Sequence, residues 1–94
     1  MQTRLPPHPA SLLKPLMVGR SVRFIAKHLR VSRGYLSRFL REESNLKADM
    51  ALRLHEAFGL DAALLLNLRD GQRLWVASRK KRAKLKPLEF KKAA

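Results

Sequence analysis

The chain has 94 residues, the length of a single domain, and its 21 Lys and Arg against 7 Asp and Glu give a formal net charge of +14. It has no cysteine, which excludes disulfide frameworks, thiol nucleophiles and cysteine-ligated zinc, and no apolar run approaches the roughly 20 residues of a membrane span. Because 46% of the residues are hydrophobic, the chain is too apolar for a disordered basic tail, and a folded domain with a polyanionic partner is the first expectation, nucleic acid before a membrane surface.

The charge is distributed unevenly along the chain. Residues 1–41 contain nine Lys or Arg and no acid, whereas residues 42–78 contain four bases and six acids. Residues 79–94 contain eight bases and one acid, Glu89. The chain is therefore basic, then close to neutral, then basic again.

The apolar residues favour helices. They include eighteen Leu and eleven Ala but only one Ile and four Val, and no useful segment alternates apolar and polar residues with period two. We predict an all-α fold, a five-helix repressor-like helix-turn-helix domain over residues 10–78. A proline-rich arm, residues 1–9, precedes it, and a basic tail or helix extension, residues 79–94, follows it.

Three short helices are expected in the first half of the domain. Ala10–Met17 is the first candidate, although Pro15 lies inside it. Ser21 is a candidate N-cap for the second helix, whose apolar residues recur with helical spacing up to Leu29. A three-residue break follows, and Ser32 is the candidate N-cap of the third helix.

Two longer helices are expected in the second half. Lys47–Phe58 is the fourth, with Asp49 and Arg53 spaced to pair at its surface and Gly59 placed to end it. Asp61 can cap the last helix. A glycine inside that helix, Gly71, predicts a kink or a close contact with another helix.

The second and third helices form a recognisable pair. Two short helices joined by a three-residue turn, with basic residues on the outer side of both, are typical of a helix-turn-helix. In that motif the first helix crosses the phosphate backbone and the second places its N-terminal side chains in the major groove. The pattern therefore predicts binding to double-stranded DNA.

Residues near the start of the third helix are the candidates for reading bases. Arg33 is the first choice, because an arginine can grip guanine O6 and N7 with two hydrogen bonds, and Arg38 lies one turn later. Gly34 can admit a thymine methyl group, and Ser37 allows close approach or a phosphate bond. The candidates for phosphate contacts, each with solvated surface as the alternative, are Ser32, Arg23, Lys27, Arg30, Arg41 and Lys47.

Other side chains suggest no further chemistry. Aromatic residues at helical spacing, among them Tyr35, Phe39 and Phe58, favour core positions over base stacking. The three histidines lack the spacing and partners of a metal site, and no nucleophile–base pair stands out. We therefore expect no metal, no cofactor and no enzymatic activity.

Two stretches of the chain resemble a known family. Residues 25–37 resemble the core of an XRE-type, phage-repressor-like helix-turn-helix, and Ala48–Leu54 with Phe58–Gly59 and Leu66–Leu68 resembles the HigA antitoxins. The similarity runs without a gap from residue 21 to residue 75 and starts more loosely at His8-Pro9. It implies a five-helix bacterial, cytoplasmic DNA-binding protein that dimerises, represses its own promoter and neutralises an mRNA-cleaving toxin encoded beside it.

The chain departs from that family at several positions. Val22 replaces a phosphate-binding Gln, and Lys47 replaces an N-cap Thr. Arg30 replaces the turn Gly, which would cost about 1 kcal/mol if the turn requires a positive φ. Glu42 and Glu43 replace a Gly-Lys pair and would repel DNA if they face its backbone. The resemblance therefore does not transfer the details of the phosphate contacts.

The partners expected are a palindromic operator, a second copy of the chain and, by the resemblance, a ribonuclease toxin. Binding to a membrane is not expected. Because one short recognition helix reads few bases, a dimer on two half-sites is expected. The predicted dimer surface, for which core burial is the alternative, is the leucine-rich face comprising Leu64, Leu65, Leu68, Leu74 and Trp75.

Three alternatives to the autoregulating antitoxin stay open. They are a stand-alone repressor of a phage or mobile element, a protein that mainly caps a toxin, and an RNA-binding protein. The basic tail is most simply a nonspecific phosphate clamp, but it can also be a docking segment for an acidic partner, an RNA-binding arm or a solvated helix extension.

Overall fold

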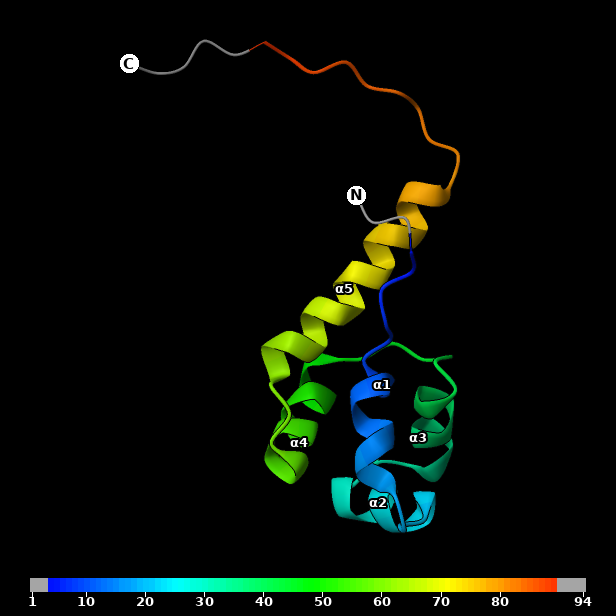
Figure 1. Cartoon of the computed structure of the whole chain (residues 1–94), viewed down its shortest axis with the longest axis vertical. Coiled ribbons are helices and arrows are strands. Elements are labelled where there is room, and N and C mark those ends of the chain that lie inside the picture. Colours follow the sequence, from blue (N-terminus) through cyan, green and yellow to red (C-terminus); the bar gives the residue numbers. More distant parts are fainter. Residues whose placement is uncertain (1–3, 90–94) are drawn as a thin grey trace, which may run out of the picture.

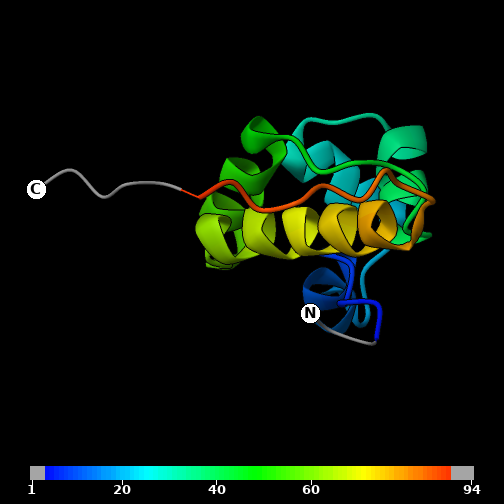
Figure 2. The ribbon, with the colours of Figure 1, turned by 90° about the horizontal axis from the view of Figure 1, so that it is seen from above.

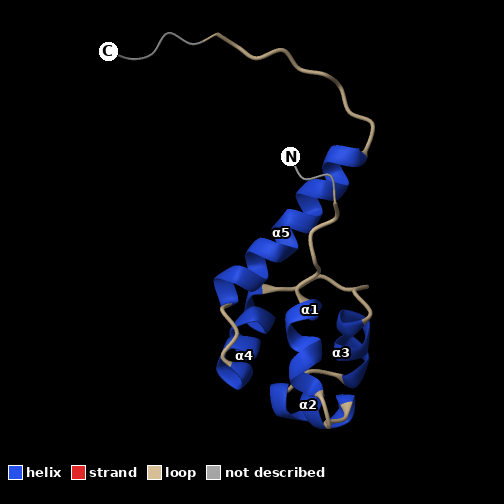
Figure 3. Cartoon of the chain, viewed as in Figure 1, coloured by secondary structure: helices blue, strands red, loops and turns tan. Residues whose placement is uncertain are grey.

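The structure is a computed structural model that describes residues 4–89, and this part of the chain is made of helices and loops without a β-strand (Figure 3). The all-α prediction is therefore confirmed. In chain order the elements are α1 (Ala10–Leu13), the 3-10 turn η1 (Lys14–Met17), α2 (Val22–Leu29), α3 (Arg33–Leu40), α4 (Ala48–Phe58) and α5 (Ala62–Arg79).

The predicted first helix changes type partway along. It is α-helical over Ala10–Leu13 and continues as η1, where Pro15 occupies one of the first two positions. Proline lacks the backbone N–H and its ring clashes with the carbonyl four residues earlier, so it disfavours continued α-helix, whereas a 3-10 turn accepts it at its start.

The predicted helix boundaries are confirmed where a cap is local. The side chains of Ser21, Ser32 and Asp61 accept hydrogen bonds from backbone N–H groups of the turns that they start, at 3.1, 3.0 and 2.9 Å. Gly59 ends α4 with a φ of 73°. Lys47 makes no side-chain cap bond, as expected where the family has a threonine. The first turn of α4 therefore depends on packing.

The core lies where the helices meet. Figure 1 shows α1, α2 and α3 grouped together, with α4 beside them and the long α5 extending beyond the group. α4 packs against α5 and α2, and α3 packs against α1 and α2. The fully or almost fully buried apolar residues are Ala10, Leu13, Ile25, Ala26, Leu29, Leu36, Phe39, Leu46, Met50, Ala51, Leu54 and Leu65.

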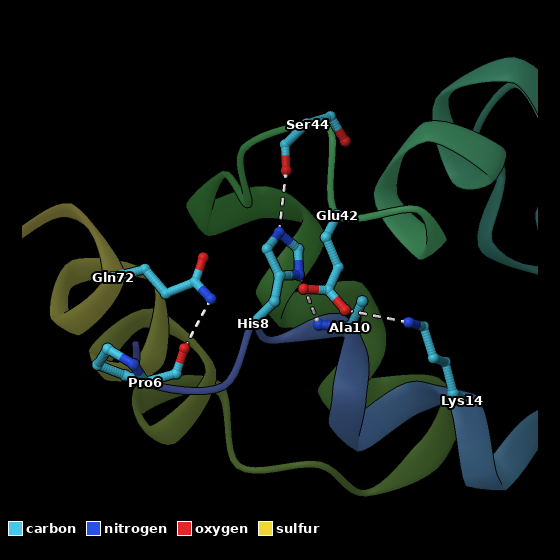
Figure 4. Close-up of polar contacts among 7 residues, drawn as sticks. All are labelled: Pro6, His8, Ala10, Lys14, Glu42, Ser44 and Gln72. Carbon is cyan, nitrogen blue, oxygen red and sulfur yellow. Dashed lines mark hydrogen bonds and ion pairs between the residues drawn. The ribbon is translucent and has the colours of Figure 1, made fainter. Parts of the chain in front are cut away.

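The segment before α1 is held against the rest of the domain (Figure 4). His8 is buried; its Nδ1 accepts a hydrogen bond from the Ala10 N–H at 3.0 Å, and its Nε2 lies 3.3 Å from the Ser44 carbonyl oxygen. Because Nδ1 accepts, Nε2 carries the ring proton of neutral His8 and donates to Ser44. The Gln72 amide of α5 donates to the Pro6 carbonyl at 2.7 Å. The segment thus links α5 to the loop between α3 and α4.

α5 runs through its glycine without interruption, from Ala62 to Arg79. A Cβ at Gly71 would lie 3.7 Å from the Pro6 ring, so the close neighbour of this glycine is the non-helical N-terminal segment and not the helix that was expected. Seen from above, Figure 2 places that segment beside α5. Residues 80–89 lie outside any helix, and no helix in the described part of the chain is long and apolar enough to cross a membrane.

Candidate nucleic-acid interface

The turn between α2 and α3 has a left-handed residue at its start. Arg30 has φ 60° and ψ 42°, and its N–H bonds to carbonyl groups of the last turn of α2, while the Val31 N–H bonds to Ala26 O at 3.0 Å. The turn therefore does require a positive φ at Arg30, the condition under which the sequence implied a cost. This geometry suits glycine, and a residue with a Cβ adopts it at a cost of about 1 kcal/mol.

Replacing Arg30 by glycine should stabilise the fold and weaken DNA binding at the same time. We expect the free energy of unfolding to rise by about 0.5–1 kcal/mol, because glycine relieves the left-handed strain but is more flexible when unfolded. If the arginine contacts a phosphate, the salt slope of DNA binding should fall by about one. Thermal melts measure the change in stability, and salt titrations measure the change in the salt slope of DNA binding. An Arg30→Gly protein less stable than the wild type would contradict the proposal that the left-handed conformation of Arg30 is strained.

A residue outside the predicted site holds this turn in place. Nη1 of Arg53, on α4, donates to the Leu29 carbonyl at 2.7 Å and to the Arg30 carbonyl at 3.1 Å. Its Nε donates to Asp49 Oδ2 at 2.7 Å, which confirms the predicted pair within α4. The last carbonyls of a helix lack intrahelical partners, and a guanidinium supplies both charge and several donors. Arg53 therefore fixes α2 and the turn relative to α4.

No local sequence pattern signals the contact of Arg53 with the turn. Its spacing from Asp49 predicts only a surface ion pair within one helix. The carbonyls that it binds are 23 and 24 residues away along the chain, and only the packing of α2 on α4 brings them together.

The start of α3 presents the two predicted base-reading arginines. Arg33 is the first residue of the helix, directly after the cap Ser32, and it is exposed. A Cβ at Gly34 would lie 3.4 Å from Arg38 Nη1, so the guanidinium of Arg38 reaches back over the glycine toward the helix start. Arg33, Gly34 and Arg38 are exposed, and Ser37 is partly buried. The missing side chain at position 34 leaves room for Arg38.

The candidate phosphate residues are all exposed: Ser32, Arg23, Lys27, Arg30, Arg41 and Lys47. One of them has a competing partner, because Arg41 Nε donates to Glu43 Oε2 at 2.9 Å. Glu42 likewise pairs with Lys14 at 3.1 Å. These exposed pairs are each worth only about 1 kcal/mol or less, but they bring a cation close to each glutamate that replaces the family's Gly-Lys.

A further cation lies at the start of α2, just before its cap. The Arg20 guanidinium lies 5.7 Å from the centroid of the Phe24 ring, and both side chains are exposed. This contact holds the charge near the helix start, where the family has its phosphate-binding Gln. Arg20 is therefore a phosphate candidate that helix spacing alone does not reveal.

The aromatic residues near α3 belong mostly to the core. Phe39 is fully buried, and its ring lies 5.4 Å from that of His8 and 6.4 Å from that of Tyr35. The Tyr35 hydroxyl donates to the Asn45 carbonyl at 3.2 Å, and burial raises the pKa of Tyr35. These contacts fasten α3 to the loop that follows it. Among residues 4–89, no group of His, Asp or Glu is arranged to hold a metal ion.

The predicted dimer surface on α5 needs one correction. Leu65 is completely buried within its own chain, so its assignment to a dimer surface is wrong; its side chain faces the core. Leu64 is 45% exposed, and Leu68 and Trp75 are partly exposed at helical spacing from it. Leu74 is 69% exposed but lies about a third of a turn away from Trp75.

Comparison with known proteins identifies the family. A helix-turn-helix family model matches residues 13–65, which is more than half of the chain. The chain belongs to the helix-turn-helix family. This helix-turn-helix protein is 36% identical over 81 residues to virulence-associated protein I of Dichelobacter nodosus, an alignment covering 81% of this chain and 73% of that protein.

Comparison with solved structures shows which members of the helix-turn-helix family this chain resembles. An addiction module antidote protein of the HigA family from Coxiella burnetii matches with a TM-score of 0.71 and 30% identity, over 79% of this chain and 84% of that one. The antitoxin HigA of Pseudomonas aeruginosa, solved with the higBA promoter, matches with a TM-score of 0.68 and 31% identity, over 77% and 82%. The helix-turn-helix protein is thus HigA-like, which confirms the resemblance seen in the sequence.

Proposed function

We propose that this HigA-like protein is a sequence-specific DNA-binding repressor and the antitoxin of a type II toxin–antitoxin module, which represses its own operon and neutralises an mRNA-cleaving toxin. The observation that carries the proposal is the exposed start of α3, where Arg33 is the first helical residue and the Arg38 guanidinium reaches back over Gly34. The Pseudomonas aeruginosa relative solved with promoter DNA supports duplex DNA as the ligand class.

In the proposed complex α3 enters the major groove with its N-terminal end toward the bases. Arg33 and Arg38 read base edges, with the two donors of each guanidinium matching guanine O6 and N7. The cations of α2 and the turn contact phosphates and set the register without reading sequence. Arg53 contributes from behind the turn by holding α2 in place.

A dimer is consistent with base reading by α3 alone. An α3 of eight residues presents only a few side chains to the groove, so two copies on two half-sites supply the missing specificity. The exposed side of α5 with Leu64, Leu68 and Trp75 is the proposed contact between copies. A ribonuclease toxin tends to be basic, so it would dock on the near-neutral part of the chain, residues 42–78, where six of the seven acids lie.

The direct test uses the DNA upstream of the protein's own gene. A gel shift should show tighter binding to this duplex than to a shuffled duplex, by on the order of a thousandfold, and footprinting should reveal two half-sites about one helical turn apart. Equal affinity for the two duplexes, or stronger competition by RNA than by DNA, would refute the repressor.

A second experiment separates the antitoxin from a stand-alone repressor. The small reading frame next to the gene is expressed alone and together with this protein, and growth and mRNA integrity are followed. Rescue of growth by coexpression supports the antitoxin. A neighbouring product without toxicity, combined with intact operator binding, favours the stand-alone repressor.

A further inference from the structure

The basic tail leaves the domain from a well-anchored point. On α5, Arg69 Nη1 donates to the Leu46 carbonyl at 2.9 Å, and near the end of the helix the Arg79 guanidinium lies 4.7 Å from the centroid of the Trp75 ring. Residues 80–89 continue from there, exposed and outside any helix. In Figure 1 they follow an extended path from the end of α5, which lies far from α2.

Four cations of residues 80–89 lie at alternate positions. Lys80, Arg82, Lys84 and Lys86 occupy alternate positions, which we call the cation stripe. In an extended chain, alternate residues lie on the same side and are about 6.6 Å apart. The positions between them hold Lys81 and the apolar Ala83 and Leu85. The spacing thus forms a row of four charges along one edge.

Most acids of the domain already have partners other than this row. Four acids in its helices and loops already pair with other cations: Glu42 with Lys14, Glu43 with Arg41, Asp49 with Arg53 and Asp70 with Arg69. Within residues 4–89 no stripe cation forms an ion pair. Attraction to the C-terminal end of α5 falls off within one turn, so it explains a cation at position 80 but not those at 84 and 86.

A membrane surface fits the tail less well than DNA does. Residues 80–89 do not form the amphipathic helix that lies in a membrane interface, because they are not helical and contain Pro87. Leu85 and Leu88 are 85% and 77% exposed, and their spacing does not place them on one side of an extended strand. The regular row of positive charges, and not the apolar residues, is therefore the feature of the tail that indicates a binding partner, and that partner is negatively charged.

We propose that the tail is a second DNA contact, an extended strand whose cation stripe follows the phosphates of the duplex that flanks the half-site read by α3. This inference rests on the proposed repressor function and extends it. Because the tail starts far from α2 in Figure 1, it contacts phosphates beyond those held by α2 and the turn. It adds affinity and salt dependence, and it leaves sequence preference to α3.

The test compares the full-length protein with a variant in which all four stripe cations are glutamine: Lys80→Gln, Arg82→Gln, Lys84→Gln and Lys86→Gln. Binding is measured by fluorescence anisotropy between roughly 50 and 200 mM salt. One duplex ends at the half-sites, and the other extends about one helical turn beyond each. We expect the long duplex to raise the salt slope of the wild type by about three to four per chain, and the variant to lose this increment and bind the long duplex at least tenfold more weakly.

The controls separate this proposal from its rivals. Leu85→Ser with Leu88→Ser keeps every charge and should bind as the wild type does, and all variants should melt at the same temperature because the tail makes no core contact. An unchanged salt slope in the glutamine variant, or a loss seen only with single-stranded RNA, would overturn the proposal. Equal wild-type binding to own-promoter and shuffled DNA would instead refute the sequence-specific repressor, and the effect of the stripe on duplex DNA would still be measurable.

Discussion

Replacing Arg53 by alanine is expected to lower the free energy of unfolding by about 2–3 kcal/mol. The substitution removes a charged donor from the Leu29 and Arg30 carbonyls, at 2.7 and 3.1 Å, and leaves the end of α2 without these partners. For a domain of this size the melting temperature should fall by about 8–20 °C. Operator binding should also weaken, because Arg53 holds the turn that leads into α3. Thermal and denaturant unfolding measure the first effect, and a gel shift measures the second.

Two matched variants distinguish the role of Arg53 from that of a surface ion pair. Arg53→Lys keeps the charge but not the planar fork, so it should recover less than half of the lost stability. Asp49→Ala removes the ion pair within α4, and because the Asp49 side chain is 76% exposed the change should stay below about 0.5 kcal/mol. An Arg53→Ala protein as stable as Asp49→Ala would show that the turn contacts contribute little.

Replacing Arg33 by alanine is expected to reduce operator affinity by about 1–3 kcal/mol in each half-site and to leave most of the affinity for shuffled DNA. Arg33 is exposed at the first position of α3, so removing its side chain should leave the fold intact. A symmetric dimer carries the substitution twice, which makes this the largest expected change in DNA binding. Anisotropy titrations with the own-promoter duplex and the shuffled duplex measure the ratio of the two dissociation constants for each protein.

Two further variants test whether Arg33 reads a base or only supplies charge. Arg33→Lys retains the charge without the bidentate geometry, so it should behave like alanine on the operator and like the wild type on shuffled DNA. Lys27→Ala, on the outer side of α2, should weaken binding to both duplexes alike and lower the salt slope by about one. Equal losses on both duplexes for Arg33→Ala would make Arg33 a phosphate contact.

The sequence by itself determined those features whose interacting groups are neighbours along the chain. Ser21, Ser32 and Asp61 cap the turns that they start, and Gly59 ends α4, because each of these interactions spans a few residues. The helical spacing of apolar residues, the short break at Arg30 and the basic outer faces of both helices predicted the helix-turn-helix, and the family resemblance strengthened that prediction. The change of helix type at Pro15 also follows from local stereochemistry, whereas the positive φ of Arg30 runs against the preference of arginine and was suggested only by the family's glycine at this position.

Only the tertiary structure decided which groups meet when they are far apart in sequence. Leu64 and Leu65 are adjacent in a leucine-rich helix, yet the first is 45% exposed and the second is buried, because the packing of α5 selects one side of the helix. Arg53 meets the turn, and the Pro6 carbonyl meets Gln72, across 23 and 66 residues. Helical periodicity shows which residues share a side, but burial and long-range hydrogen bonds depend on how the helices pack, and local spacing carries no information about that packing.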